Sequence, residues 1–174
     1  MNMHATEFAG GARAAWAKAG TQPRIAIIGA GMSGIAAVVK LRKAGYTDLT
    51  VYEKTSKVGG TWRENQYPGL SCDIPSRWYS FSFNLNPNWT HRFSYGPEIQ
   101  AYMEATAEKF GVTDIVKFNT PVADLTYEGP QWRLTTGDGT VEHYDVVISA
   151  TGVLHKPAFP KIDGLDTFAG DMFH

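Results

Sequence analysis

A glycine triplet directly after a short apolar run is the feature that most constrains how this chain can fold. Gly29, Gly31 and Gly34 form G-x-G-x-x-G after the apolar residues 25–28. The first glycine permits a tight turn out of a strand, the second lets backbone approach a pyrophosphate, and the third lets the next helix pack against the sheet. Phosphates then meet unpaired N–H groups at the positive end of a helix dipole, and Ser33 adds a hydroxyl there.

The segments on both sides of the triplet predict a β–α–β unit. The helix is expected to run to about Ala44, with Gly45 suited to a left-handed C-cap. Leu49–Tyr52 is typical of a second strand, and Glu53 follows it, 19 residues after the last glycine. A carboxylate at that position accepts hydrogen bonds from ribose hydroxyls and repels a 2′-phosphate, which favours FAD or NAD over NADP.

Two alternatives stay open for this unit. The glycines could serve packing alone in an ordinary β–α–β unit that binds no nucleotide. The basic side chain of Lys54, next to Glu53, could contact a phosphate and so weakens the argument against NADP.

Composition excludes several classes of protein. A length of 174 residues with a formal net charge of −1 predicts one domain and no nucleic-acid or membrane partner held by charge. No apolar run is long enough to span a bilayer, and the N-terminus lacks the pattern of a secretory signal. Cys72 is the only cysteine, so no internal disulfide can form, and we expect a soluble, cytoplasmic protein.

The sequence also predicts the boundary of the folded domain. Residues 1–22 are predicted to be a loosely ordered N-terminal extension, with Thr6 as a possible N-cap of a short helix. The folded domain is expected to cover residues 23–174.

About forty residues after Glu53 show no sustained periodicity, and loops this long are usually functional. They hold nine of the 22 aromatic residues: Trp62, Tyr67, Trp78, Tyr79, Phe81, Phe83, Trp89, Phe93 and Tyr95. The neutral charge balance is unlike a surface for single-stranded nucleic acid, so a lining for a flat ring system is favoured. Plain packing is the alternative, and it suits Phe81 and Phe83 best.

The rest of the chain predicts a helix, a short strand and a meander before a final strand. Pro97–Phe110 has the termini of a helix, and Ile115–Phe118 is a short strand. Three runs joined by turn residues predict the antiparallel meander: Val122–Tyr127, Gln131–Thr136 and Thr140–His143. Tyr144–Ser149 is apolar enough for a central parallel strand, and the small residues Ala150, Thr151 and Gly152 follow it. The expected fold is α/β, with a parallel sheet and an antiparallel meander insertion.

The sequence shows no metal-ligand or nucleophile motif that could catalyse a reaction without a cofactor. The histidines lack the spacing of metal ligands, so no metal site is predicted. Ser33 is followed two residues later by Ile35, where a nucleophile elbow needs glycine. Cys72 precedes Asp73, whose charge disfavours a thiolate nucleophile. A cofactor is therefore expected to supply the chemistry.

The spacing of two glycine motifs carries a resemblance to a known family. Glu53 and the pair Gly59-Gly60 have E-x₅-G-G spacing, and residues 27–37 fit I-x-G-x-G-x-x-G-x-x-A. Together they resemble the FAD site of flavoproteins with two dinucleotide-binding domains. The segment GGTWRENQYPGLSCDIPSRWYSFSF is similar to class B flavin monooxygenases, most of all to the Baeyer–Villiger type. Residues 150–152 also match, and residues 168–174 resemble the F-x-G-x-x-x-H start of the Baeyer–Villiger fingerprint.

The resemblance implies a cofactor pair and a reaction. In that family NADPH reduces FAD, oxygen adds at flavin C4a, and the peroxyflavin attacks a small-molecule ketone or other soft substrate. Family members are several hundred residues long, with a second glycine-rich domain for NADPH and a catalytic arginine downstream. The resemblance therefore implies the N-terminal part of an FAD domain that is inactive alone, with the rest of the same polypeptide downstream. An N- or S-oxygenating flavin monooxygenase and a non-catalytic FAD- or NAD-binding module are the alternatives.

Residue roles follow from the resemblance alone. The glycine turn and Ser33 would bind the pyrophosphate. Glu53 would bind the ribose, and the backbone of Val122 would contact the adenine. Asp73 would sit by the isoalloxazine and pair with the missing arginine in a supporting catalytic role, with a helix or turn cap as its alternative. His174 would belong to a hinge between domains. The cofactor-binding set is Gly29, Gly31, Ser33, Gly34, Glu53, Gly60, Thr61, Trp62, Ser71, Cys72, Asp73, Tyr79, Val122, Ala150, Thr151 and Gly152.

Overall fold

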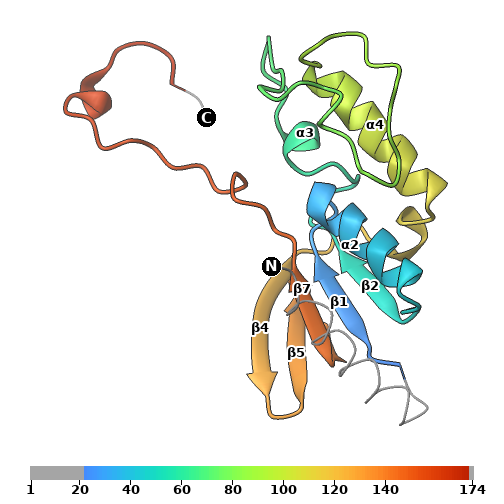
Figure 1. Ribbon diagram of the computed structural model, residues 1–174. Helices are drawn as coiled ribbons and strands as arrows, with labels where there is room; N and C mark the ends of the chain where they lie inside the picture. The colour runs from blue at the N-terminus through green and yellow to red at the C-terminus, as the bar shows by residue number, and fades with distance from the viewer. Residues whose placement is uncertain (1–21, 173–174) are drawn as a thin grey trace, which may run out of the picture.

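A four-stranded parallel sheet forms the centre of the computed structural model, which describes residues 22–172 (Figure 1). The strand order is β3-β2-β1-β7, and all three pairings are parallel. The strands are β1 (Ile25–Ile28), β2 (Leu49–Tyr52), β3 (Val116–Lys117) and β7 (Val146–Ser149). Together with the antiparallel meander described below, this confirms the predicted α/β fold with a parallel sheet and a meander insertion.

The β1–α2–β2 unit forms where the sequence predicts it. Helix α2 (Met32–Lys43) buries Ile35 and Val38 against the sheet, while lysine and arginine side chains occupy its last turn. The helix ends one residue earlier than expected, with Ala44 as its C-cap. Gly45 then adopts a left-handed φ of 92°, and its N–H donates to the Arg42 carbonyl at 2.9 Å. Glycine is favoured at this position after the C-cap because other residues rarely adopt that conformation.

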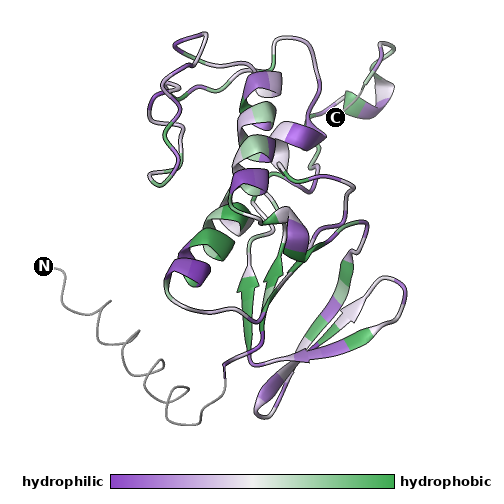
Figure 2. Cartoon of the chain, turned by 90° about the vertical axis from the view of Figure 1, so that its right-hand side faces the viewer, coloured by the Kyte–Doolittle hydropathy of each residue, from purple (hydrophilic) through white to green (hydrophobic). Residues whose placement is uncertain are grey.

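Strand alternation divides the core into two clusters on opposite faces of the sheet. Ile25 and Ile27 of β1 pack in the larger cluster with side chains of α2 and α4 (Gly96–Lys109). Ala26, between them in β1, points to the other face and packs in the smaller cluster with Leu134 and Tyr144. Figure 2 shows the hydrophobic colour concentrated on the strands of the parallel sheet. The helices therefore cover one face and the meander covers the other.

The meander consists of β4 (Val122–Glu128), β5 (Gln131–Thr136) and β6 (Val141–Tyr144), paired antiparallel in chain order. The predicted boundary between the last two strands is wrong by one to two residues, because Tyr144 ends β6 and β7 begins at Val146. Asp145 makes the break: its N–H donates to the Arg24 carbonyl at 3.0 Å, and its carboxylate accepts from the Arg24 N–H at 2.8 Å.

Strand β7 does not take the central position that its apolar run predicts. It pairs with β1 on one edge and stands at the end of the sheet within residues 22–172. Its apolar character has another cause: Val146 and Ile148 pack against the helix-side cluster, and Val147 packs against the meander-side cluster. An apolar run indicates that both faces of a strand are covered. It does not predict whether the strand pairs with neighbours on one edge or on both.

Helix α4 forms one residue earlier than the predicted range Pro97–Phe110, and Phe110 is its C-cap. The predicted strand Ile115–Phe118 shortens to β3, because a 3₁₀ turn over Thr113–Ile115 precedes it. Phe81 and Phe83 pack as predicted: their rings stack with centroids 4.9 Å apart, and Phe81 is 7% exposed. The helix α3 (Thr61–Glu64) was not predicted.

Beyond Gly152 the chain extends away from the sheet, with a 3₁₀ turn at Leu165–Thr167 near its end (Figure 1). The predicted helix after Thr6 and the hinge residue His174 lie outside the described residues. Within residues 22–172, no helix is long and apolar enough to cross a membrane.

Candidate dinucleotide-binding site

A cleft of about 500 Å³ lies at the carboxyl ends of the parallel strands. In the strand order, β1 is followed on one side by β2 and on the other by β7. Ligands of open α/β sheets bind at such a switch point, outside the carboxyl ends of the strands. Twelve of the sixteen predicted cofactor-binding residues line the cleft: Gly29, Gly31, Ser33, Glu53, Gly60, Thr61, Trp62, Tyr79, Val122, Ala150, Thr151 and Gly152.

The first and third glycines of the triplet lie where a side chain would collide with neighbouring backbone. Gly29 has a φ of 103°, and a Cβ at this position would lie 2.6 Å from the Ala150 carbonyl oxygen. A Cβ at Gly34 would collide with the carbonyl oxygen of Gly29. Gly34 is buried in α2 and does not line the cleft, so its contribution is the close packing of helix on turn.

The second glycine faces the second glycine motif across the cleft. A Cβ on Gly60 would lie 3.1 Å from the Cα of Gly31, and a Cβ on Gly31 would lie 3.5 Å from the Cα of Gly60. Side chains at either position would therefore fill the space between two backbone segments. The first turn of α2, which opens here, carries no acidic residue and presents N–H groups that have no intrahelical acceptor. The arrangement fits a pyrophosphate.

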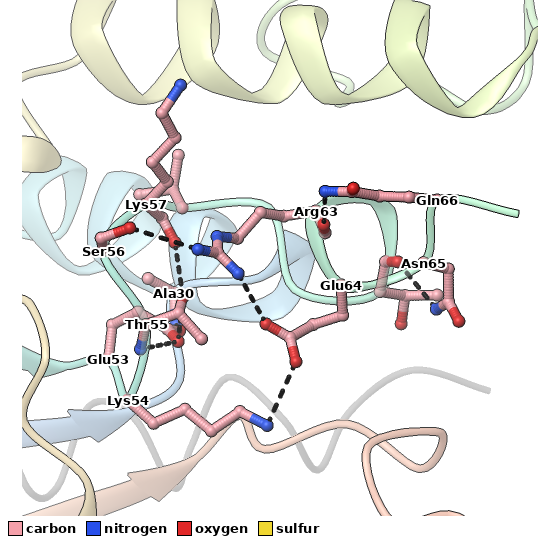
Figure 3. Close-up of polar contacts among 12 residues, drawn as sticks. Ala30, Glu53, Lys54, Thr55, Ser56, Lys57, Arg63, Glu64, Asn65 and Gln66 are labelled. Atoms are coloured by element: carbon pink, nitrogen blue, oxygen red, sulfur yellow. Dashed lines mark hydrogen bonds and ion pairs between the residues drawn. The ribbon is translucent and has the colours of Figure 1, made fainter. Parts of the chain in front are cut away.

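Glu53 is 6% exposed and already ties the end of β2 to the glycine turn (Figure 3). Its Oε2 accepts a hydrogen bond from the Ala30 N–H at 2.8 Å, and its Oε1 accepts from the N–H and hydroxyl of Thr55 at 3.0 and 2.9 Å. A carboxylate oxygen has two acceptor sites, so Oε2 keeps one for a ribose hydroxyl. The contact with Ala30 was not predicted, because the two residues are 23 positions apart and follow different strands.

Trp62 and Tyr79 form the aromatic part of the wall. The indole N–H of Trp62 donates to the Tyr79 hydroxyl at 2.9 Å, and the rings meet edge to face with centroids 5.6 Å apart. Burial raises the pKa of the Tyr79 hydroxyl, so it stays protonated at neutral pH. The other seven aromatic residues of the long loop do not line the cleft, and Trp78 is 80% exposed. The predicted ring lining therefore reduces to two residues.

Ser71, Cys72 and Asp73 do not line the cleft within the described structure. Ser71 is exposed and forms a β-bridge with Tyr95, Cys72 is buried, and Asp73 is exposed. Burial is the main cause of the raised pKa of Tyr79, and the charge of Asp73 adds to it.

Ion pairs that the sequence did not predict lie at the cleft. Lys54 Nζ lies 3.4 Å from Glu64 Oε2, and Arg63 Nη1 lies 3.0 Å from the other carboxylate oxygen of Glu64. Arg63 Nη2 in turn donates to the Ser56 hydroxyl at 3.2 Å (Figure 3). Lys54 and Glu64 line the cleft. Glu64 could have been found from the sequence, since it follows Gly60 by one helical turn.

Helix α4 restrains the second glycine motif from behind. Gln100 Nε2 donates to the Val58 carbonyl at 2.8 Å and to Glu104 Oε1 at 3.0 Å. Its Oε1 is buried without a hydrogen-bond partner, and a Cβ on Gly59 would collide with it. Gln100 therefore fixes the turn that brings Gly60 to Gly31.

Within residues 22–172, no group of three or more His, Cys, Asp or Glu residues is placed to hold a metal ion.

Sequence comparisons find similar proteins among the monooxygenases. Residues 27–105 match the family of NAD(P)-binding Rossmann-like domains. An uncharacterised monooxygenase of Mycobacterium tuberculosis is 50% identical over 155 residues, which are 89% of this chain and 31% of that protein. A Baeyer–Villiger monooxygenase of Streptomyces coelicolor is 47% identical over 153 residues, which are 87% of this chain and 29% of that protein.

Solved structures of monooxygenases are also similar to this chain. Cyclohexanone monooxygenase from Rhodococcus sp. Phi1 bound to NADP⁺ superposes with a TM-score of 0.77 at 34% identity, over 88% of this chain and 30% of that one. OTEMO in complex with FAD and NADP superposes with a TM-score of 0.77 at 32% identity, over 87% of this chain and 30% of that one. By sequence and by fold, the chain is similar to Baeyer–Villiger monooxygenases, and it spans less than a third of the length of the relatives it matches.

Proposed function

We propose that the cleft binds FAD and that the chain is the FAD-binding part of an NADPH- and O₂-dependent monooxygenase of the Baeyer–Villiger type. One observation carries the proposal: the two glycine motifs meet backbone to backbone, beside a buried carboxylate at the end of β2. FAD shares its adenosine and pyrophosphate with the NAD(P) family, and the E-x₅-G-G spacing favours FAD. An FAD- and NADP-bound relative of the same fold supports the choice.

In this proposal each wall of the cleft holds one part of the cofactor. Gly29, Gly31 and Ser33 bind the pyrophosphate through the open first turn of α2. Glu53 accepts a ribose hydroxyl, and the backbone of Val122 contacts the adenine.

Towards the ring end of the cofactor, Gly60, Thr61, Trp62 and Tyr79 lie along its path, and Ala150, Thr151 and Gly152 offer backbone without bulk. Ser71, Cys72 and Asp73 are proposed near the flavin, with Asp73 in a supporting role. Gly34 contributes through packing alone.

The flavin, once bound, supplies the electron transfer and oxygen chemistry that no side chain of the chain can supply. The residues themselves bind and orient the cofactor. The Trp62–Tyr79 pair also holds one wall in place, because the indole N–H of Trp62 donates to the Tyr79 hydroxyl.

The folded unit is proposed to be residues 23–174, with residues 1–22 as an extension. NADPH and a ketone or other soft substrate are assigned mainly to the remainder of a longer polypeptide. This assignment rests on the share of the relatives that the chain covers.

Reconstitution tests the cofactor. The purified chain is incubated with FAD or with NAD⁺ and separated from free nucleotide by gel filtration, and the bound fraction is read by its visible flavin absorption or its nicotinamide content. We expect FAD to remain bound and NAD⁺ to be lost. Gly31→Val should abolish retention, since Gly31 has an ordinary φ of −77° and the added side chain fills the gap to Gly60 without straining the backbone.

Ala105→Val is the control, because Ala105 is exposed on α4. Loss of FAD from the parent chain, or equal retention by Gly31→Val, would contradict the proposal. The activity is tested separately: the isolated chain should not oxidise NADPH in the presence of a ketone. Ketone-dependent oxidation by this chain alone would contradict the assignment of NADPH to other residues.

A further inference from the structure

Lys54 bears on whether the cleft accepts a nucleotide with a 2′-phosphate. It follows Glu53 at the end of β2, and its side chain is 47% exposed and lines the cleft. In related folds a basic residue near this acid accommodates the 2′-phosphate of NADP. An unengaged Lys54 would therefore offset the repulsion that Glu53 exerts on a 2′-phosphate.

The structure shows Lys54 engaged. Its ammonium lies 3.4 Å from Glu64 Oε2, across the cleft on α3. Glu64 is held in turn, because Arg63 Nη1 contacts its Oε1 at 3.0 Å and Arg63 Nη2 donates to Ser56 at 3.2 Å. Figure 3 shows the chain of contacts from Ser56 to Lys54.

The charges at this end of the cleft balance. Glu53 and Glu64 contribute two negative charges, and Lys54 and Arg63 contribute two positive charges. Without Glu64 the same place would carry a net positive charge and an unpaired ammonium next to the ribose-binding carboxylate. Removing this one carboxylate would therefore favour a doubly charged phosphate there.

We propose that Glu64 is a specificity-determining residue, which withholds Lys54 from a 2′-phosphate and keeps the cleft selective for adenine nucleotides with a free 2′-hydroxyl. The inference rests on the proposed function, because it takes Glu53 as the ribose-binding residue.

The test compares two ligands that differ only at the 2′ position. ADP-ribose and its 2′-phosphate share the adenosine and pyrophosphate of FAD, and calorimetry gives a Kd for each. The measured quantity is the ratio of the 2′-phosphate Kd to the ADP-ribose Kd. Glu64→Gln should lower this ratio about five-fold, the upper range for one exposed ion pair. The double variant Glu64→Gln/Lys54→Met should restore it.

Glu128→Gln is the matched control, because it also removes one carboxylate from an exposed ion pair, with Arg133, on the meander. The inference is overturned if Glu64→Gln leaves the ratio unchanged, if Glu128→Gln lowers it equally, or if Lys54→Met fails to restore it. Glu64 is about one-third exposed, and Glu64→Ala gives the same comparison if the Gln variant does not fold. Failure of the parent chain to bind ADP-ribose would contradict the proposed function, whereas an unchanged ratio contradicts only this inference.

Discussion

Glu53 Oε2 accepts a hydrogen bond from the Ala30 N–H at 2.8 Å, and this bond joins the end of β2 to the turn that follows β1. Ala30 is fully buried, and Glu53 is nearly so. The carboxylate that is proposed to bind the ribose therefore also shapes the glycine turn that is proposed to bind the pyrophosphate. One side chain couples two parts of the cofactor site.

Glu53→Gln should weaken both folding and cofactor binding. An amide has one acceptor oxygen, so it cannot serve both Ala30 and Thr55 as the carboxylate does. Urea unfolding should show a loss of about 1–3 kcal/mol, and FAD titration should show weaker binding. Thr55→Val is the control, since it removes only the Thr55 hydroxyl contacts and keeps the bond to Ala30. Equal effects of the two variants on FAD binding would contradict the coupling.

Gly60→Ala should reduce cofactor binding more than stability. The new Cβ lies 3.1 Å from the Cα of Gly31 and narrows the gap between the two glycine motifs. Gly60 has a φ of 56° and a ψ of −122°, a backbone conformation that glycine adopts far more readily than alanine, so the substitution also strains the backbone. Gly129→Ala is the control, because it also places alanine at a positive φ, of 78°, but with nothing within 4 Å of its Cβ. FAD retention should fall only in Gly60→Ala, and equal retention by both variants would count against the gap as the binding site.

Gly59→Ala and Gln100→Ala should be energetically coupled. A Cβ at Gly59 collides with Gln100 Oε1, and Gly59 also has a φ of 127° that disfavours alanine. Removing the Gln100 side chain relieves the collision but leaves the backbone strain. A double-mutant cycle by urea unfolding should therefore give a coupling free energy of about 1 kcal/mol, with the double variant more stable than the sum predicts. Strict additivity would show that Gln100 does not restrain this turn.

The ion pair between Lys117 and Glu142 should make stability depend on acid pH. The hydrogen bond from Lys117 lowers the pKa of Glu142 below its ordinary value of 4.5. A lowered folded-state pKa gives stability that is fully present above the unfolded pKa and is lost as pH falls through the folded pKa. Between about pH 5 and pH 3 the Tm of the parent chain should therefore fall more steeply than that of Glu142→Gln. Parallel curves would contradict this contribution.

Local patterns predicted most of the elements, because they depend on neighbours in the chain. The triplet at 29–34, the left-handed Gly45 after helix α2 and the strand Leu49–Tyr52 formed as expected. The predicted strand boundary at Tyr144 was wrong, because an apolar residue at a strand junction fits either strand. Only the contacts of Asp145 with Arg24 decide which strand Tyr144 joins.

The sequence by itself determined the β1–α2–β2 unit, because the turn and the start of the helix depend on the local spacing of the glycines. The tertiary structure alone decided three things about the cleft. Gly60 was brought to Gly31, Gln100 was set behind Gly59, and Glu64 was paired with Lys54. Each joins residues from separate elements, and a contact between elements depends on how they pack, which periodicity and spacing along one chain do not encode.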